Sequence, residues 1–122
     1  RSLVTGEPMS FNPIPTHDWT HARDFASGVM TCIDNVDILT KLADNVVNIG
    51  TGTAFTNEDI LIRLEVIADR VVKFTNDYKE PPHHSPLWVA DNTLLKSLGW
   101  EQQVTLEEGL RETYAFYKER YK

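Results

Sequence analysis

All six prolines of this 122-residue chain fall in two short stretches, and their distribution limits where regular structure can form. Proline has no backbone N–H and restricts the residue before it, so neither stretch suits the interior of a helix or of a central strand. We therefore predict two irregular segments, with helices and strands between and after them. The prolines are Pro8, Pro13, Pro15, Pro81, Pro82 and Pro86.

Outside the proline stretches, apolar residues recur at intervals of three and four, which is the pattern of an amphipathic helix. This pattern predicts a helix over residues 20–34 and a second one after an N-cap at Thr56. A short helix should end near Gly99. The last helix should begin after Thr105, which forms a capping-box sequence with Glu108.

Three short segments have the composition of strands. Residues 46–49 form a β-rich run that ends at a glycine turn, which predicts a buried strand with a tight exit. Residues 71–74 and 9–11 are further strand candidates. Together with the helices, they predict that residues 1–122 form one α/β domain, a small mixed lobe with about four helices and two or three short strands.

Composition excludes several classes of function. The formal net charge of -6 argues against broad nucleic-acid binding, which requires a basic surface. No apolar run approaches the roughly 20 residues of a membrane helix, and no signal peptide is visible. The single cysteine, Cys32, forms no disulfide within the chain, which favours a reducing, cytoplasmic location. Because the chain starts at Arg1 rather than Met, we expect it to begin inside a longer product or after a cloning remnant.

Four pieces of the chain, the first of them made of two segments, resemble in order the motifs of one family. Residues 6–11 (G-E-P-M-S-F) and 17–29 (H-D-W-T-H-A-R-D-F-A-S-G-V) resemble G-x-P-L-x-I-Y-G…R-D-F-x-x-V-D-D-x-A-x-x-I. Residues 48–56 (N-I-G-T-G-x-x-F-T) are similar to F-N-I-G-S-G…S, and residues 90–100 (A-D-N-T-L-L-K-S-L-G-W) to D-x-S-K-A-x-x-x-L-G-W. Residues 104–117 resemble S-L-E-E-G-L-x-x-T-x-x-W-Y. These are motifs of extended short-chain dehydrogenases/reductases that act on nucleotide sugars.

The resemblance implies that residues 1–122 are the C-terminal, substrate-binding lobe of such an enzyme. In that family the lobe lies beside a Rossmann domain and closes over a nucleotide diphosphate sugar. The parent enzyme would be an NAD(P)-dependent epimerase, dehydratase or reductase, and thus an isomerase, lyase or oxidoreductase. The chain would then be a fragment, a subunit that completes a partner, or a non-catalytic relic.

The redox machinery of that family is missing from this sequence. No glycine-rich dinucleotide fingerprint is present. Tyr114 and Lys118 have the spacing of the family's Tyr-x-x-x-Lys pair, but they fall in the terminal helix, which resembles a different part of the family. We therefore predict no catalytic residue and no cofactor in this chain, with NAD(P) held by the parent enzyme.

The family implies two arginine contacts to the substrate, and this sequence has histidine at or near both. His17 stands at the arginine of R-D-F, while His83 and His84 lie in the loop that would carry the second arginine. Arginine offers a permanently charged fork to phosphate, whereas histidine offers one donor per nitrogen and is half charged near pH ~6.5. Each histidine is therefore either a substrate contact or a solvated residue, with a capping role also open to His17.

Two further residues are candidate substrate contacts. Phe11 matches the aromatic residue that lies near the base in relatives, and it is alternatively a core aromatic. Arg23 replaces one acid of V-D-D and would supply positive charge near the diphosphate. The retained Asp24 is explained by a cap or dipole role at a helix start. Trp19 and Trp88 are expected to pack.

Two rival functions remain open. His17 and His21 are four residues apart and, with His83 or His84 and a nearby aspartate, could form a zinc-binding module, although no cysteine pair supports it and we predict no metal site. A lobe separated from its Rossmann partner would also expose an apolar face. Such a face favours self-association, as in an interaction or assembly domain.

Overall fold

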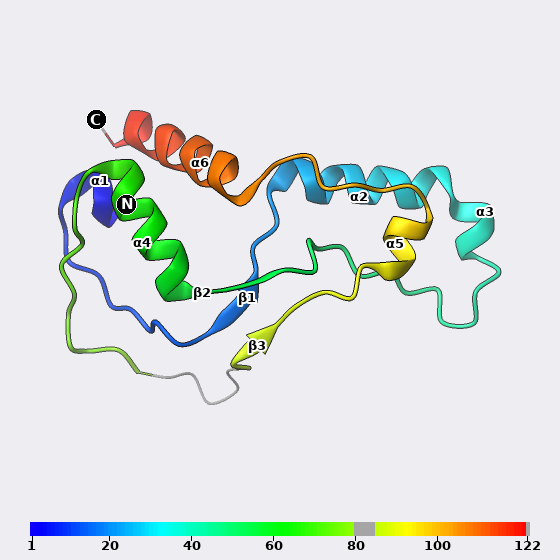
Figure 1. Ribbon diagram of the computed structural model, residues 1–122, viewed down its shortest axis with the longest axis horizontal. Coiled ribbons are helices and arrows are strands. Elements are labelled where there is room, and N and C mark those ends of the chain that lie inside the picture. Colours follow the sequence, from blue (N-terminus) through cyan, green and yellow to red (C-terminus); the bar gives the residue numbers. More distant parts are fainter. Residues whose placement is uncertain (80–84, 122) are drawn as a thin grey trace.

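The computed structural model describes residues 1–79 and 85–121 (Figure 1). These residues form an α/β fold, as predicted, with six helices and a three-stranded sheet. The helix count exceeds the predicted four because α1 and α3 are single turns of four residues. The elements are α1 (Ser2–Thr5), β1 (Thr16–Asp18), α2 (Ala22–Asp34), α3 (Val36–Leu39), β2 (Ala54–Thr56), α4 (Asn57–Ala68), β3 (Leu87–Trp88), α5 (Thr93–Ser97) and α6 (Leu106–Arg120).

The predicted helix starts at Thr56 and Thr105 are confirmed. The Thr56 side chain accepts the Asp59 N–H, and the Asp59 carboxylate accepts the Thr56 N–H, so α4 begins with a reciprocal capping box. Thr105 and Glu108 form the same arrangement at α6. These caps satisfy backbone donors that a helix leaves unpaired at its first turn.

The sheet has the strand order β2-β1-β3, with β1 antiparallel to β2 and parallel to β3. The predicted strand at residues 46–49 is wrong, because no neighbouring strand pairs with this run in the described part of the chain. The candidates at residues 9–11 and 71–74 are reduced to one parallel bridge between Met9 and Phe74. The true strands β1 and β3 instead follow directly after Pro15 and Pro86.

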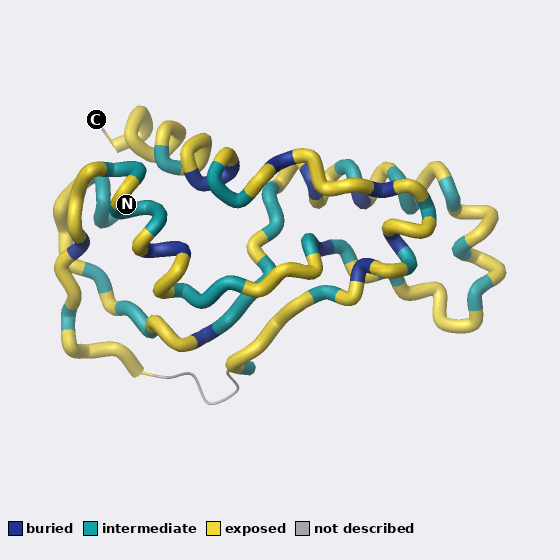
Figure 2. Tube along the Cα trace, in the orientation of Figure 1, coloured by how far each residue is buried: buried dark blue, intermediate teal, exposed yellow. Residues whose placement is uncertain are grey.

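Two groups of helices lie on opposite sides of the sheet along the long axis of the molecule (Figure 1). Helix α4 packs against α1 and α6, whereas α2 packs against α3 and α5. The buried positions form short, separate stretches of the chain (Figure 2). Their apolar side chains are Ile60, Leu61, Val72, Leu95, Trp100, Val104 and Leu110.

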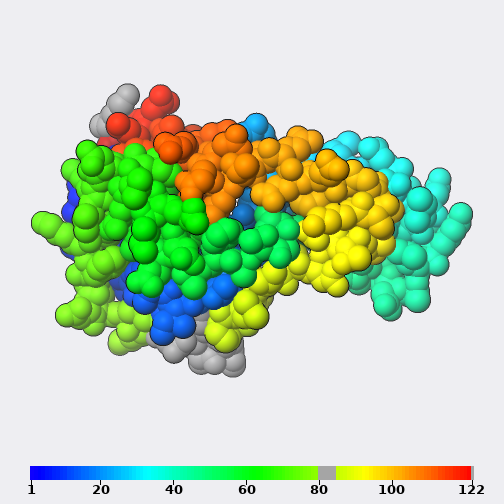
Figure 3. Space-filling view, viewed as in Figure 1, coloured from blue at the N-terminus to red at the C-terminus, as the bar shows by residue number. Residues whose placement is uncertain are grey.

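The predicted helix at residues 20–34 is confirmed as α2, but most of its apolar stripe faces solvent. Phe25, Met30 and Ile33 are 53%, 54% and 57% exposed. The buried positions of α2 are Asp24 and Gly28, and the side chains of Ile49 and Leu95 closely cover the position of Gly28. The α2–α3 end, cyan in the space-filling view, projects from the rest of the molecule (Figure 3).

Candidate functional site: the cleft beside strand β1

A cleft of about 520 Å³ opens beside β1 and β3. Three stretches of chain form its walls: the end of β1, the run that leads into the glycine turn, and β3 with the residues after it. This cleft contains one of the predicted site residues, His17. It is lined by His17, Asp18, Asn48, Ile49, Leu87, Trp88, Val89 and Ala90.

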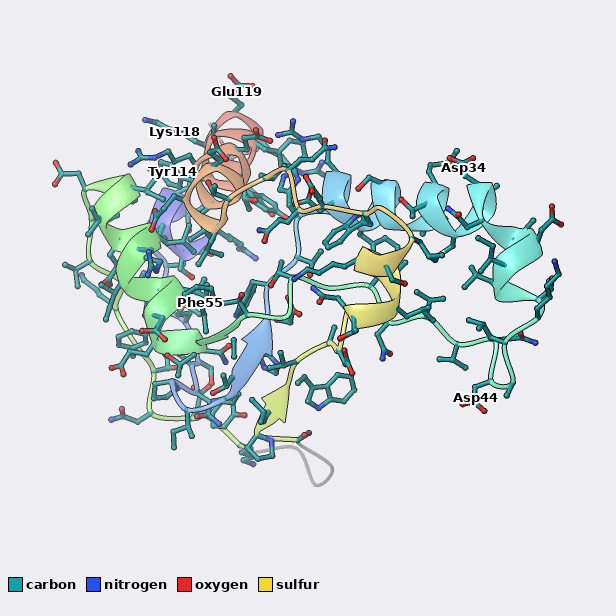
Figure 4. All side chains as sticks on the ribbon, turned by 45° about the vertical axis from the view of Figure 1, so that its right-hand side comes forward. Asp34, Asp44, Phe55, Tyr114, Lys118 and Glu119 are labelled. Carbon is teal, nitrogen blue, oxygen red and sulfur yellow. The ribbon has the colours of Figure 1, made fainter. Side chains whose placement is uncertain are left out.

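His17 occupies the middle of β1 and therefore the middle of the sheet. Its register partners are Phe55 on β2 and Trp88 on β3, so the three side chains share one face of the sheet. Figure 4 shows Phe55 at β2, next to α4. The His17 ring also meets the edge of the Trp19 ring, with centroids 6.1 Å apart. An imidazole is thus placed among aromatic rings at the edge of an open cleft.

Trp88 does not pack as expected. It is 66% exposed, and it lies on β3, an edge strand whose ladder partner in the described chain is β1 alone. An exposed indole beside a histidine offers a flat apolar face next to a hydrogen-bond donor, a combination that suits a ligand with both a ring and a charged group.

Asp18, the neighbour of His17, accepts an unusual number of hydrogen bonds. Its carboxylate accepts the N–H groups of Thr51 at 2.9 Å, Gly52 at 2.8 Å and Ala90 at 3.3 Å. The hydroxyls of Thr51 and Thr20 donate as well, at 2.7 and 3.1 Å. Burial alone raises the Asp18 pKa, but the hydrogen bonds from Thr51, Gly52 and Ala90 outweigh it, so the pKa lies below its usual value.

Phe11 lies in other surroundings. Its ring stacks on that of Phe74, with centroids 5.5 Å apart. It lines an apolar cleft of about 460 Å³ near α1 and α4, together with Met9, Trp19 and Ile60, and His17 is not among the lining residues of that cleft. The two predicted contacts therefore stand at separate openings, and the role of Phe11 against a base stays a prediction.

Arg23 points toward α6 rather than into the His17 cleft. Its guanidinium forms an ion pair with Glu112, whose carboxylate also lies 3.5 Å from Nε2 of His21. The His21 side chain caps α2, because its Nδ1 accepts the Arg23 N–H at 3.2 Å. Arg23 and His21 thus join the start of α2 to α6, and the charge of Arg23 is compensated there.

Asp24 has a role that the sequence did not reveal. It is 1% exposed, and its carboxylate accepts the N–H groups of Gln103 at 2.9 Å and Val104 at 3.1 Å. Its carbonyl accepts the Trp100 indole N–H at 3.2 Å. Asp24 therefore holds the segment before α6 against α2. No local signal predicts this contact, since the partners are about eighty positions apart.

The Tyr114 and Lys118 pair lies on α6, on the side of the molecule away from β3 (Figure 4). The Lys118 ammonium lies over the face of the Tyr114 ring, 5.8 Å from its centroid. In this geometry the charge interacts with the π-face of the ring. The pair thus forms a cation–π contact within α6.

The described residues allow two sequence predictions to be checked: whether the histidines form a metal site, and whether a helix could span a membrane. His83 and His84 lie outside the described residues. Within residues 1–79 and 85–121, no group of three histidine, cysteine or acidic side chains could hold a metal ion. In the same part of the chain, no helix is both long and apolar enough to cross a bilayer.

Comparison with curated proteins gives relatives whose names refer to sugar nucleotides. A probable GDP-L-fucose synthase from Oryza sativa subsp. japonica is 28% identical over 105 residues, which cover 86% of this chain and 30% of that protein. A dTDP-glucose 4,6-dehydratase from Shigella flexneri is 26% identical over 108 residues, which cover 82% and 28%. No protein-family model matches the chain.

Solved structures share the fold. UDP-glucuronic acid 4-epimerase from Bacillus cereus, in complex with UDP-glucuronic acid and NAD, matches with a TM-score of 0.81 and 24% identity, over 98% of this chain and 38% of that one. RMD from Pseudomonas aeruginosa, complexed with NADPH, matches with a TM-score of 0.78 and 15% identity, over 95% and 37%. At these identities the structures establish the fold alone.

The chain resembles the C-terminal part of extended short-chain dehydrogenases. The resemblance that the motifs indicated is thereby confirmed. The chain spans about 30% of the length of the curated relatives that it matches. The whole-protein activities of those relatives therefore do not transfer directly to it.

Proposed function

We propose that the chain is the nucleotide-sugar-binding lobe of an NAD(P)-dependent epimerase, dehydratase or reductase, and that it is not catalytic alone. The observation that carries this proposal is the position of His17. It stands where the resemblance implies a phosphate-binding arginine, and it lines an open cleft beside the exposed indole of Trp88. The relatives named above act on GDP-, dTDP- and UDP-linked sugars by their names.

The chemistry of the cleft is compatible with a diphosphate. A histidine donates to a phosphate oxygen, most strongly when it is protonated. The Asp18 charge would oppose an anion, but its oxygens already face three N–H dipoles and two hydroxyls. We expect weaker and more pH-dependent binding than an arginine would provide.

The proposed function requires a second domain that carries NAD(P), because this sequence has no glycine-rich dinucleotide fingerprint. Two features support a Rossmann domain as the partner. The apolar stripe of α2 is exposed at Phe25, Met30 and Ile33, and the β-rich run 46–49 has no strand partner in the described chain while Val46 is 67% exposed. The sheet of an α/β domain would cover the apolar stripe of α2, and one of its strands would pair with residues 46–49.

Titration of the ¹⁵N-labelled chain with UDP-glucuronic acid, a GDP-sugar and a dTDP-sugar tests the proposal. We expect saturable shifts at the amide of His17 and at the indole N–H of Trp88, with smaller shifts at Phe11. His17→Ala should abolish the shifts, and His17→Arg should tighten binding and reduce its dependence on pH. The proposal is wrong if no sugar nucleotide shifts the cleft signals at millimolar concentration.

A second candidate function is an assembly domain, and the exposed stripe of α2 is the observation that favours it. Light scattering after gel filtration distinguishes the two functions. Dimers that persist without nucleotide binding, and that Met30→Glu dissociates, would favour assembly. A monomer that binds a sugar nucleotide would favour the binding lobe.

A further inference from the structure

We propose that Asp18 is a positioning residue that fixes the three walls of the His17 cleft relative to one another. The inference deepens the proposed function, since it concerns the same cleft. It assigns no ligand contact to Asp18, which acts through the backbone of the residues around it.

The partners of Asp18 lie on a wall of the cleft, as Ala90 does, or directly after one, as Thr51 and Gly52 do. Asp18 itself ends β1, directly after His17. Its carboxylate accepts N–H groups from Thr51 and Gly52, in the turn that follows Asn48 and Ile49. It also accepts the N–H of Ala90, in the segment that follows Trp88. One side chain thus connects three segments that are more than thirty positions apart in the sequence.

Gly50 makes this close approach possible. A Cβ atom at position 50 would lie 2.6 Å from Oδ2 of Asp18 and 2.6 Å from Cβ of Ala90. Any side chain there would separate the turn from both other walls. From the opposite side, the buried Asn92 donates to the Gly50 carbonyl at 2.9 Å. The glycine turn is therefore held at two points, and the Asp18 carboxylate connects it to the end of β1, next to His17.

The experiment must show whether Asp18 positions the cleft or only stabilises the fold. Asp24 provides a matched control for this distinction. Asp24 is buried, and its carboxylate likewise accepts backbone N–H groups, from Gln103 and Val104. Asp24 does not line the cleft. A loss of stability should therefore follow from either substitution, whereas a loss of cleft geometry should follow only from a change at Asp18.

The experiment compares Asp18→Asn with Asp24→Asn in the full chain, at a temperature where circular dichroism shows each variant folded. The first readout needs no ligand: hydrogen exchange of the amides of Thr51, Gly52 and Ala90. We expect Asp18→Asn to expose these amides and to shift the Trp88 indole signal, because an amide side chain presents N–H groups to backbone donors. Asp24→Asn should leave the Trp88 indole signal unchanged and should raise exchange at the three amides by no more than its loss of global stability does.

The second readout is the affinity for UDP-glucuronic acid. Asp18→Asn should weaken it by roughly tenfold through lost preorganisation, with Asp24→Asn within about twofold of the wild type. If the wild-type chain binds no sugar nucleotide, the proposed function fails while the exchange readout still decides the role of Asp18. Unchanged exchange at the three amides in Asp18→Asn, or equal losses of affinity in both variants, would overturn the inference.

Thr51 provides a milder test in case Asp18→Asn does not fold. Thr51→Val removes the 2.7 Å hydrogen bond from the hydroxyl to Asp18 and preserves the shape of the side chain. It should change the Ala90 amide and the Trp88 indole in the same direction, by a smaller amount. Thr51→Ser retains the hydroxyl and should restore both signals. Failure of serine to restore them would contradict the proposed role.

Discussion

Replacing Asp24 by alanine should destabilise the fold more than any comparable change on its surface. The Asp24 carboxylate is 1% exposed and accepts two backbone N–H groups at 2.9 and 3.1 Å. Hydrogen bonds to a charged group contribute about 1.5–3 kcal/mol each, so their loss amounts to about 3–6 kcal/mol. A domain of this size is stable by only about 5–15 kcal/mol. The substitution therefore removes a large share of the total stability.

Urea unfolding followed by circular dichroism measures this loss. The slope of free energy against urea should stay constant while the midpoint falls, which indicates a change in stability rather than in the surface exposed. Asp24→Asn should lose about half as much, since the amide oxygen still accepts one of the two N–H groups. Glu101→Ala, at an exposed acid of the same segment, should stay within about 0.5 kcal/mol of the wild type. A loss below about 1 kcal/mol for Asp24→Ala would refute the reasoning.

Three further perturbations test the packing, the caps and the carboxylates. Gly28→Ala gains about 1 kcal/mol of helix propensity, but its Cβ would lie 2.7 Å from Cγ2 of Ile49. Overpacking costs about 1–3 kcal/mol, so urea unfolding should show net destabilisation, which Ile49→Ala should reverse in the double variant. Thr105→Ala removes a side-chain acceptor at the start of α6 and should lower the melting temperature, whereas Thr105→Ser should not. Because hydrogen bonds hold the Asp18 pKa below its usual value of 3.8, its contribution is complete above that pH and is lost as the pH falls through the lowered pKa. Urea midpoints measured between pH 6 and 2 should therefore fall less steeply in Asp18→Asn, and an identical pH dependence would contradict the assignment.

The sequence predicted helix starts well, because capping signals are local. Thr56 and Asp59 are three positions apart, as are Thr105 and Glu108, and each pair forms its capping box without help from distant residues. Strands were predicted poorly, because a strand exists only where a second strand pairs with it. Strand β1, Thr16–Asp18, has one residue enriched in strands, Thr16, and follows a proline, yet β2 and β3 pair with it.

In the candidate site, as in the fold, local patterns predicted some positions but not the contacts between residues far apart in the sequence. The position of His17 followed from a motif, and the structure places it at a cleft. The contacts of Asp18 and Asp24 span 33 to 80 positions of sequence, so no local pattern could predict them. Arg23 was predicted from its charge at a motif position, but an ion pair with Glu112 on α6 determines where its guanidinium lies. Residue type indicates which chemistry is available, while tertiary contacts determine which groups can use it.

Two segments of the chain have the sequence pattern of buried structure but are not covered or paired in the described fold. The proposed function gives one physical explanation for both. Residues 46–49 have strand composition without a strand partner, and α2 has an apolar stripe without cover at Phe25, Met30 and Ile33. These segments contact each other, since Ile49 packs against the position of Gly28 on α2. A neighbouring sheet that paired with residues 46–49 would therefore also contact α2 near Gly28. If this explanation holds, adding the partner domain should protect the amides of residues 46–49 from exchange and cover the α2 stripe in one step.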